Sequence, residues 1–108
     1  MKYQVHIIAE AEEDLFSIHR FVSLNDSPER ADRLLANLEE TCLSLGELPN
    51  RGHVPPELQR VAVEDYLEIH YKMYRIIYQV ISKRVFIHCV LDGRRDLEEL
   101  LLERLLRP

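Results

Sequence analysis

Two apolar segments in the last third of the chain constrain its fold most strongly. Residues 74–80 and 85–91 are rich in β-branched and aromatic side chains, and a four-residue connection joins them. This pattern predicts two antiparallel strands with a tight turn between them. Side chains alternate along a strand, so Arg75 is expected on the face opposite to that of Tyr74 and Tyr78. One sheet face is therefore expected to be apolar and aromatic, and the other to carry a guanidinium.

The arginines of this region are the first candidates for a functional site. The second strand leads directly into residues 92–96, whose sequence is Asp-Gly-Arg-Arg-Asp. A guanidinium stays charged at any working pH and presents a planar fork of donors. We therefore expect Arg75, Arg94 and Arg95 to form one pocket that contacts a phosphate or carboxylate of a target. The alternative is that Arg75 pairs with Glu68 or Asp92 across the sheet, and that Arg94 and Arg95 only neutralise nearby acids.

The N-terminal half is predicted to be a strand followed by a helical hairpin. Alternation over residues 3–7 predicts a half-buried strand, and apolar residues at three- and four-residue spacing predict helices over 9–23 and 28–46. The apolar stripe of the first helix includes Phe21. The second helix begins strongly, with Ser27 as its N-cap and a proline at its first position. We expect the two helices to pack antiparallel.

The C-terminal half is predicted to be sheet and a short helix. Residues 58–63 and 66–71 are each compatible with a strand, which would give an antiparallel meander of three or four strands. Residues 96–106 are rich in leucine at helical spacing, and Asp96 can cap that helix. The expected fold class is therefore α+β, in one domain over residues 1–108.

Composition limits the classes of function. The chain has 108 residues, of which 46% are hydrophobic, enough for a single core. A net charge of −5 argues against a general nucleic-acid binder, because such proteins usually carry a basic surface. We find no apolar run of the length of a signal peptide or a membrane helix. We therefore expect a cytoplasmic protein with no membrane partner.

We expect no metal and no cofactor. Cys42 and Cys89 lie within apolar patterns, where a free cysteine behaves as a small hydrophobic residue. His88 lies in an apolar strand and is expected on the sheet surface. The other histidines show no metal-ligand spacing relative to one another or to the cysteines: His6, His19, His53 and His70.

The order and sequence of several short segments resemble the RelE/ParE superfamily of toxins from bacterial type II toxin–antitoxin modules. The resemblance covers almost the whole chain and implies a sheet packed by a helical hairpin. It also implies a cognate antitoxin that wraps the toxin, with a heterotetramer or larger assembly as an option. The segments that carry it are Tyr3-Gln4-Val5, Ala11 with Asp14-Leu15 and Ile18, residues 48–52, residues 74–80 and residues 92–97.

One branch of this superfamily, the RelE type, cleaves mRNA on the ribosome. By resemblance, Arg75 and Arg95 match its cationic residues, and Glu68 is a candidate base, with His70, His88 or Tyr78 as proton donor. Ribose-assisted cleavage needs a base, an acid and cations on the phosphate. The positions where relatives carry lysines are instead Tyr66 and Glu68, and the C-terminal aromatic position is Leu101.

The other branch, the ParE type, poisons DNA gyrase and lacks the nuclease residues. The turn at residues 93–96, the missing lysines and the acidic pI of about 5.5 favour this branch. We therefore expect a ParE-like toxin that acts by protein–protein contact and arrests growth, with the ribosome and mRNA as the alternative target.

A third hypothesis is a toxin-like interaction module without toxic activity. The C-terminal leucines form a surface wider than one helical stripe, which suggests contact with an antitoxin or another partner. The expected contact residues are Leu101, Leu102 and Leu105.

Overall fold

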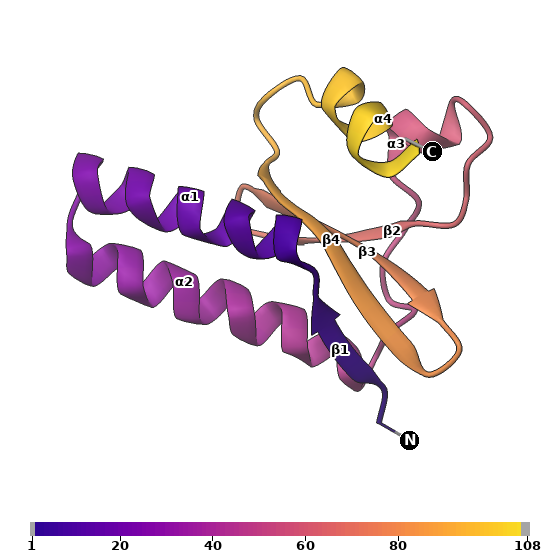
Figure 1. The fold of residues 1–108 in the computed structure, drawn as a ribbon, viewed down its shortest axis with the longest axis horizontal. Helices are drawn as coiled ribbons and strands as arrows, with labels where there is room; N and C mark the ends of the chain where they lie inside the picture. Colours follow the sequence, from indigo (N-terminus) through magenta and orange to yellow (C-terminus); the bar gives the residue numbers. More distant parts are fainter. Residues whose placement is uncertain (1, 107–108) are drawn as a thin grey trace.

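The fold is a four-stranded sheet with a long helical hairpin on one face and two short helices on the other (Figure 1). It is seen in a computed structural model that describes residues 2–106. The elements in chain order are β1 (Gln4–Ile7), α1 (Ala9–Asn25), α2 (Pro28–Leu43), the 3-10 turn η1 (Ser44–Gly46), α3 (Pro56–Gln59), β2 (Leu67–Tyr71), β3 (Tyr74–Ile81), β4 (Arg84–Asp92) and α4 (Glu98–Leu106). The predicted α+β class is confirmed.

The helical hairpin forms as predicted, with small changes at its ends. The Ser27 hydroxyl accepts a hydrogen bond from the backbone N–H of Arg30 at 3.1 Å, which satisfies one free donor of the first turn of α2. The predicted second helix divides into α2 and η1 after Leu43. α1 buries Ala11 and Leu15 toward the sheet, but Phe21 is 65% exposed and does not belong to the core stripe.

The sheet has the strand order β1-β4-β3-β2. The predicted meander of β2, β3 and β4 is antiparallel throughout. β1 adds to the free edge of β4 in parallel, with Val5 opposite Val85, and a bulge interrupts the pairing of β3 and β4 at Ile77 and Tyr78. As expected, Arg75 and Tyr74 point to opposite faces, since Tyr74 belongs to the hairpin-side core.

One predicted strand is wrong. Residues 58–63 begin in the short helix α3 and continue into a turn, where Ala62 has a φ of 60°. The physical reason is local: Pro56 occupies the first helical position and Glu57 the first turn, both favourable for a helix start. The predicted strand over residues 66–71 is confirmed as β2.

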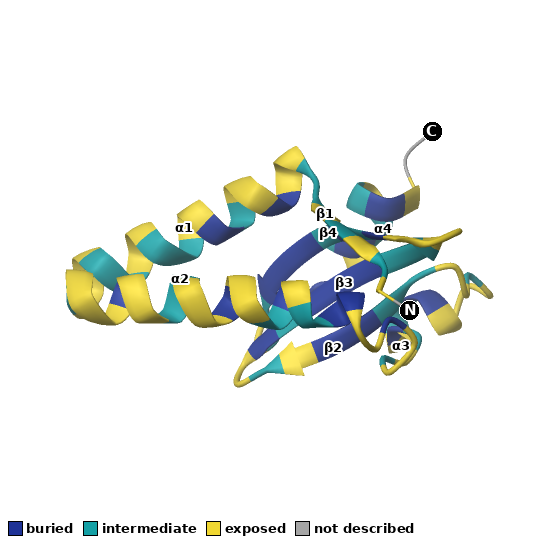
Figure 2. Cartoon of the chain, turned by 90° about the horizontal axis from the view of Figure 1, so that it is seen from below, coloured by how far each residue is buried: buried dark blue, intermediate teal, exposed yellow. Residues whose placement is uncertain are grey.

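Both sheet faces bury apolar side chains, so the second face is not the polar surface that the sequence suggested. The hairpin side includes Leu15, Leu38 and Tyr78, whereas α3 and α4 cover a second cluster. Figure 2 shows the burial concentrated in β3 and β4 and on the inward sides of the helices. The second cluster consists of Leu58, Ile77, Cys89, Leu91, Leu97, Leu101 and Leu105.

No helix within residues 2–106 is long and apolar enough to cross a membrane.

Candidate functional site on the second sheet face

The centre of the second sheet face is an ion-pair network around Arg75. The Arg75 guanidinium donates to Glu68 from Nε at 2.6 Å and from Nη2 at 3.1 Å. It also donates from Nη1 and Nη2 to the two oxygens of Glu57, both at 2.7 Å. The three side chains are 11%, 14% and 2% exposed for Arg75, Glu57 and Glu68. The guanidinium is therefore held by four hydrogen bonds to two carboxylates of the chain itself.

Three elements bring these charges together. Glu68 lies on β2 opposite Ile77, two pairs before the pair of His70 and Arg75, so its side chain shares a face with Arg75. Glu57 comes from α3, which is anchored by the fully buried Leu58. The hydrogen bonds that Arg75 donates to Glu57 and to Glu68 raise the pKa of Arg75, and the bonds to Glu57 lower the pKa of that carboxyl.

Arg94 and Arg95 do not join Arg75 in one pocket, which corrects the predicted arrangement. Arg94 donates to Asp92 from Nε at 3.1 Å and from Nη2 at 2.7 Å. This pairing lowers the pKa of Asp92 to about 2. Gly93 lies against the stem of Arg75, since a Cβ there would be 2.9 Å from Arg75 Cγ, but the Arg75 guanidinium points to Glu57 and Glu68. The alternative pairings of Arg75 with Glu68 and of Arg94 with Asp92 are the ones that form.

Arg94 and Arg95 instead line a groove of about 570 Å³ between α1, β4 and α4. Arg95 is exposed, and its side chain makes no hydrogen bond or ion pair within residues 2–106. Apolar side chains on the opposite wall give the groove a mixed character. Its other lining residues include Phe21, Tyr74, Leu100 and Arg104.

Arg104 ties α4 to the rest of the molecule beside this groove. Its guanidinium donates to the two oxygens of Asp14 at 3.1 and 3.0 Å and to the backbone carbonyl of His88 at 2.8 Å. Asp14 also accepts a hydrogen bond from the backbone N–H of Val90 at 3.0 Å. Val90 lies on the part of β4 that extends beyond the residues paired with β1. No sequence pattern indicated this contact, which joins residues 90 positions apart.

The candidate proton donors of the nuclease hypothesis lie in different environments. His88 is half-buried, with Nε2 3.3 Å from Gln79 Oε1 and its ring packed edge-on against Tyr66. Burial lowers the pKa of His88. Tyr78 lies on the hairpin side of the sheet, fully buried, where its hydroxyl accepts from the backbone N–H of Gly52. Of these three candidates, only His70 contacts the Glu68 carboxylate, at 3.3 Å.

The leucines proposed for partner contact mostly face inward. Leu101 is 0% exposed and Leu105 is 8% exposed, because both pack α4 against the second sheet face. Leu102 is half-buried against the same cluster. Leu106 is 41% exposed and is the leucine of α4 that is open to solvent. The predicted contact surface is thus largely core in the isolated chain.

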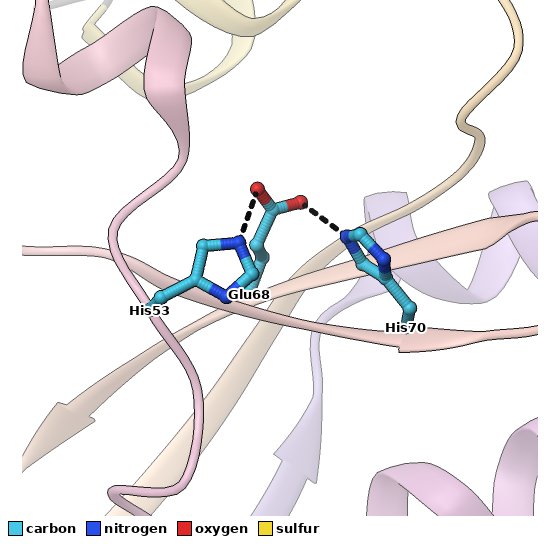
Figure 3. A group of neighbouring side chains, drawn as sticks. All are labelled: His53, Glu68 and His70. Atoms are coloured by element: carbon cyan, nitrogen blue, oxygen red, sulfur yellow. Dashed lines mark hydrogen bonds and ion pairs between the residues drawn. The ribbon is translucent and has the colours of Figure 1, made fainter.

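The structure also brings together His53, Glu68 and His70, which histidine spacing did not reveal (Figure 3). His53 Nε2 lies 3.2 Å from one oxygen of Glu68, and His70 Nε2 lies 3.3 Å from the other. His70 follows Glu68 by two positions on β2, which places both on one face. His53 arrives from a distant loop that forms an isolated antiparallel bridge with Glu68. Only the spacing of Glu68 and His70 was readable in the sequence.

A meander sheet with a helical hairpin on one face and a small C-terminal helix on the other defines the RelE/ParE type of toxin fold. The chain belongs to the ParE toxin family of type II toxin–antitoxin systems, whose family model matches residues 5–97.

Two solved structures support this fold. The chromosomal ParDE toxin–antitoxin system from P. aeruginosa aligns with a TM-score of 0.69 and 18% identity, over 82% of this chain and 94% of that chain. The RelBE2 toxin–antitoxin complex from Mycobacterium tuberculosis aligns with a TM-score of 0.61 and 21% identity, over 83% and 96% of the respective chains. A search of curated protein sequences gave no match.

Proposed function

We propose that this toxin arrests growth by inhibiting DNA gyrase through protein–protein contact, and that a cognate antitoxin neutralises it in the cytoplasm. The observation that carries the proposal is the occupation of Arg75 by Glu57 and Glu68. The nuclease hypothesis depends on this arginine, which would be the cation on β3 that contacts the phosphate. Membership of the ParE family supports the same target.

Charge explains why this face is poorly suited to RNA cleavage. Glu57 and Glu68 outnumber Arg75, so the network carries a formal charge of about −1, which repels a phosphate diester. A cation must be available to the phosphate in the transition state if it is to stabilise the developing charge. Arg75 is not available, because all three of its guanidinium nitrogens already donate to carboxylates.

One observation favours the nuclease alternative, namely the contact between Glu68 and His70. A carboxylate beside an imidazole can move protons. However, Glu68 is only 1% exposed and already accepts two hydrogen bonds from Arg75, so it is poorly placed to receive the proton of a ribose hydroxyl. The nuclease therefore remains the second candidate and an outcome of the test.

An antitoxin partner is supported by the two aligned structures, both of which are toxin–antitoxin systems. The chain also presents apolar surface for a partner, since Phe16, Phe21 and Leu24 on α1 are 56%, 65% and 78% exposed. The groove beside Phe21 adds the exposed cations Arg94 and Arg95, which suit an acidic segment. A heterotetramer or larger assembly is the expected form of the complex.

The direct test uses the purified chain on both targets. We expect loss of gyrase supercoiling activity and no mRNA cleavage on programmed ribosomes. Arg94→Ala with Arg95→Ala should weaken gyrase inhibition if the groove contacts the target, whereas Arg33→Ala, an exposed arginine on α2, serves as the matched control. Ribosome-dependent cleavage with intact supercoiling would establish the nuclease instead. If neither activity is affected, the inert interaction module replaces both proposals.

A further inference from the structure

We propose that His53, Glu68 and His70 bind a divalent transition-metal ion of the Zn²⁺ or Ni²⁺ class. The ion would link the loop before α3 to β2. The proposal is independent of gyrase inhibition, and it assigns a role to two histidines that the proposed function does not use. Two imidazoles and one carboxylate are a donor set that zinc sites use, with a solvent molecule at the fourth position.

The distances suit one ion with small adjustments. One ligand atom from each residue lies within 4.8 Å of the other two. Two donors of one tetrahedral zinc ion are about 3.4 Å apart, given metal–ligand bonds of about 2.0–2.2 Å. Both imidazoles already lie within 3.3 Å of a Glu68 oxygen, so the main movement is of one imidazole toward the other. Their side chains are 61% and 53% exposed for His53 and His70, which leaves room for that movement.

The carboxylate is already oriented for binding. Glu68 is 1% exposed and lies on β2, where Arg75 holds it with hydrogen bonds of 2.6 and 3.1 Å. A charged partner behind a metal-binding carboxylate fixes its rotamer and direction. In Figure 3 the carboxylate lies between the two imidazoles, with one oxygen toward each.

Backbone hydrogen bonds also hold His53 and Glu68 next to each other. His53 N–H donates to the carbonyl of Glu68 at 3.1 Å, and Glu68 N–H donates to the carbonyl of His53 at 2.7 Å. Residues that face each other in such a bridge point their side chains to the same face. Gly52 permits this close approach, since a Cβ there would be 2.6 Å from the Glu68 carbonyl oxygen and from Tyr78 Oη.

Charge favours a cation at this place. Glu57 and Glu68 contribute two negative charges and Arg75 one positive charge, and neutral imidazoles add none. The excess negative charge lies just beneath the two exposed histidines. An ion bound there would stabilise the folded state alone, because the three ligands are 15 and 2 positions apart in the sequence and meet only after folding.

The test is titration of the tag-free chain with Zn²⁺, and separately with Ni²⁺, by calorimetry, together with the melting temperature with and without the ion. We expect one ion per chain, a rise in melting temperature that EDTA reverses, and roughly tenfold or greater loss of affinity in His53→Ala and in His70→Ala. Co²⁺ bound to the parent chain should show the visible absorption of a low-coordinate site, which both variants lose.

The matched control is His19→Ala, because His19 also contacts a carboxylate, Asp32, at 2.8 Å, but lies on the helical hairpin. Its affinity should equal that of the parent chain. Absence of saturable binding to the folded parent would overturn the proposal. Equal affinity in the parent and in both His53→Ala and His70→Ala would overturn it too. These variants leave Glu68 and Arg75 paired, so they are expected to fold, which far-ultraviolet circular dichroism verifies.

Discussion

At the scale of single residues, Arg75 decides the chemistry of the second sheet face. It pairs with two carboxylates at N–O distances of 2.6 and 2.7 Å, and the three side chains are only 2–14% exposed. Such a group adds little net stability compared with an apolar replacement of the whole network, but removal of one member leaves the others unpaired. The network is therefore sensitive to single substitutions whatever the target of the toxin.

Arg75→Ala should lower the free energy of unfolding by about 3–5 kcal/mol, because Glu57 and Glu68 would keep their burial and lose their cation. Urea denaturation measures this change. Arg95→Ala, at an exposed site, should change it by less than about 0.5 kcal/mol. Equal effects of the two substitutions would contradict the structure. Loss of toxicity in Arg75→Ala is consequently uninformative unless folding is measured beside it.

The lowered pKa of Glu57 predicts a dependence of stability on pH. Hydrogen bonds from Arg75 hold the pKa in the folded state below its ordinary value of 4.5, so the folded state binds fewer protons than the unfolded state. This stabilisation is present above about pH 4.5 and is lost as the pH falls through the folded-state pKa. Glu57→Gln should therefore show a weaker loss of stability between about pH 6 and pH 3.

The measurement for Glu57 is the urea midpoint of both chains at several pH values. Glu64→Gln, at an exposed glutamate in the connection between α3 and β2, is the control and should follow the parent curve. Parallel curves for the parent and Glu57→Gln would show that this carboxylate does not contribute to the pH dependence of stability.

Sequence reasoning at this scale named two of the three members of the network, with their pairing as an alternative hypothesis. Strand alternation placed Arg75 on the correct face and offered Glu68 as its partner, because both depend only on the two-residue period of β2 and β3. Glu57 could not be foreseen, since it came before the strand expected over residues 58–63 and the helix α3 was not predicted. His53 could not be foreseen either, because a loop-to-strand bridge has no period in the sequence.

At the scale of elements, α4 is a structural helix before it is a binding surface. Its inward leucines complete the second core. Arg104 also fixes it to α1 through Asp14. The leucine-rich pattern was interpreted as an excess of apolar surface because the C-terminal leucines are wider than one helical stripe. A face that is itself apolar absorbs a wide leucine stripe.

Leu101→Ala should lower the free energy of unfolding by about 2–5 kcal/mol, as expected for a fully buried leucine. Leu106→Ala, at a 41% exposed position on the same helix, should cost less than about 0.5 kcal/mol. Thermal and urea denaturation of the two variants would measure the difference. A small effect for Leu101→Ala would mean that α4 does not pack as described.

Gly52→Ala should lower the free energy of unfolding by about 1–3 kcal/mol, because the added Cβ would meet two atoms at 2.6 Å and force the loop away from β2. The backbone pair of His53 and Glu68 should open in the same variant, and amide hydrogen exchange at Glu68 would report it. Asn50→Ala, two positions earlier and exposed, is the control for the loop. Unchanged exchange in Gly52→Ala would contradict the close approach.

The elements with strong local signals were predicted well. β3, β4 and the start of α2 follow from β-branched runs and from the cap at Ser27. The strand prediction for residues 58–63 was wrong because their apolar side chains fit a strand by composition. Two consecutive prolines before them instead start a helix. The parallel pairing of β1 with β4 is a tertiary choice that no local pattern specifies.

At the scale of the whole molecule, the sheet is covered on both faces. The hairpin covers one face and α3 with α4 the other (Figure 1). The side chains of the Arg75 network are only 2–14% exposed, so this network is not open as a nucleic-acid surface. Four of the large exposed apolar residues lie on the hairpin, and the exposed Arg95 lies beside the groove next to α1. This distribution, together with a net charge of −5, fits contact with proteins better than contact with RNA.

The most direct test of the account is pulse-labelling of DNA and protein synthesis in bacteria immediately after induction of this chain without an antitoxin. A gyrase inhibitor predicts that incorporation of labelled thymidine falls first, while incorporation of labelled methionine continues. Early loss of protein synthesis with continuing DNA synthesis would contradict the account and return Glu68, His88 and Arg95 to the role of catalytic candidates.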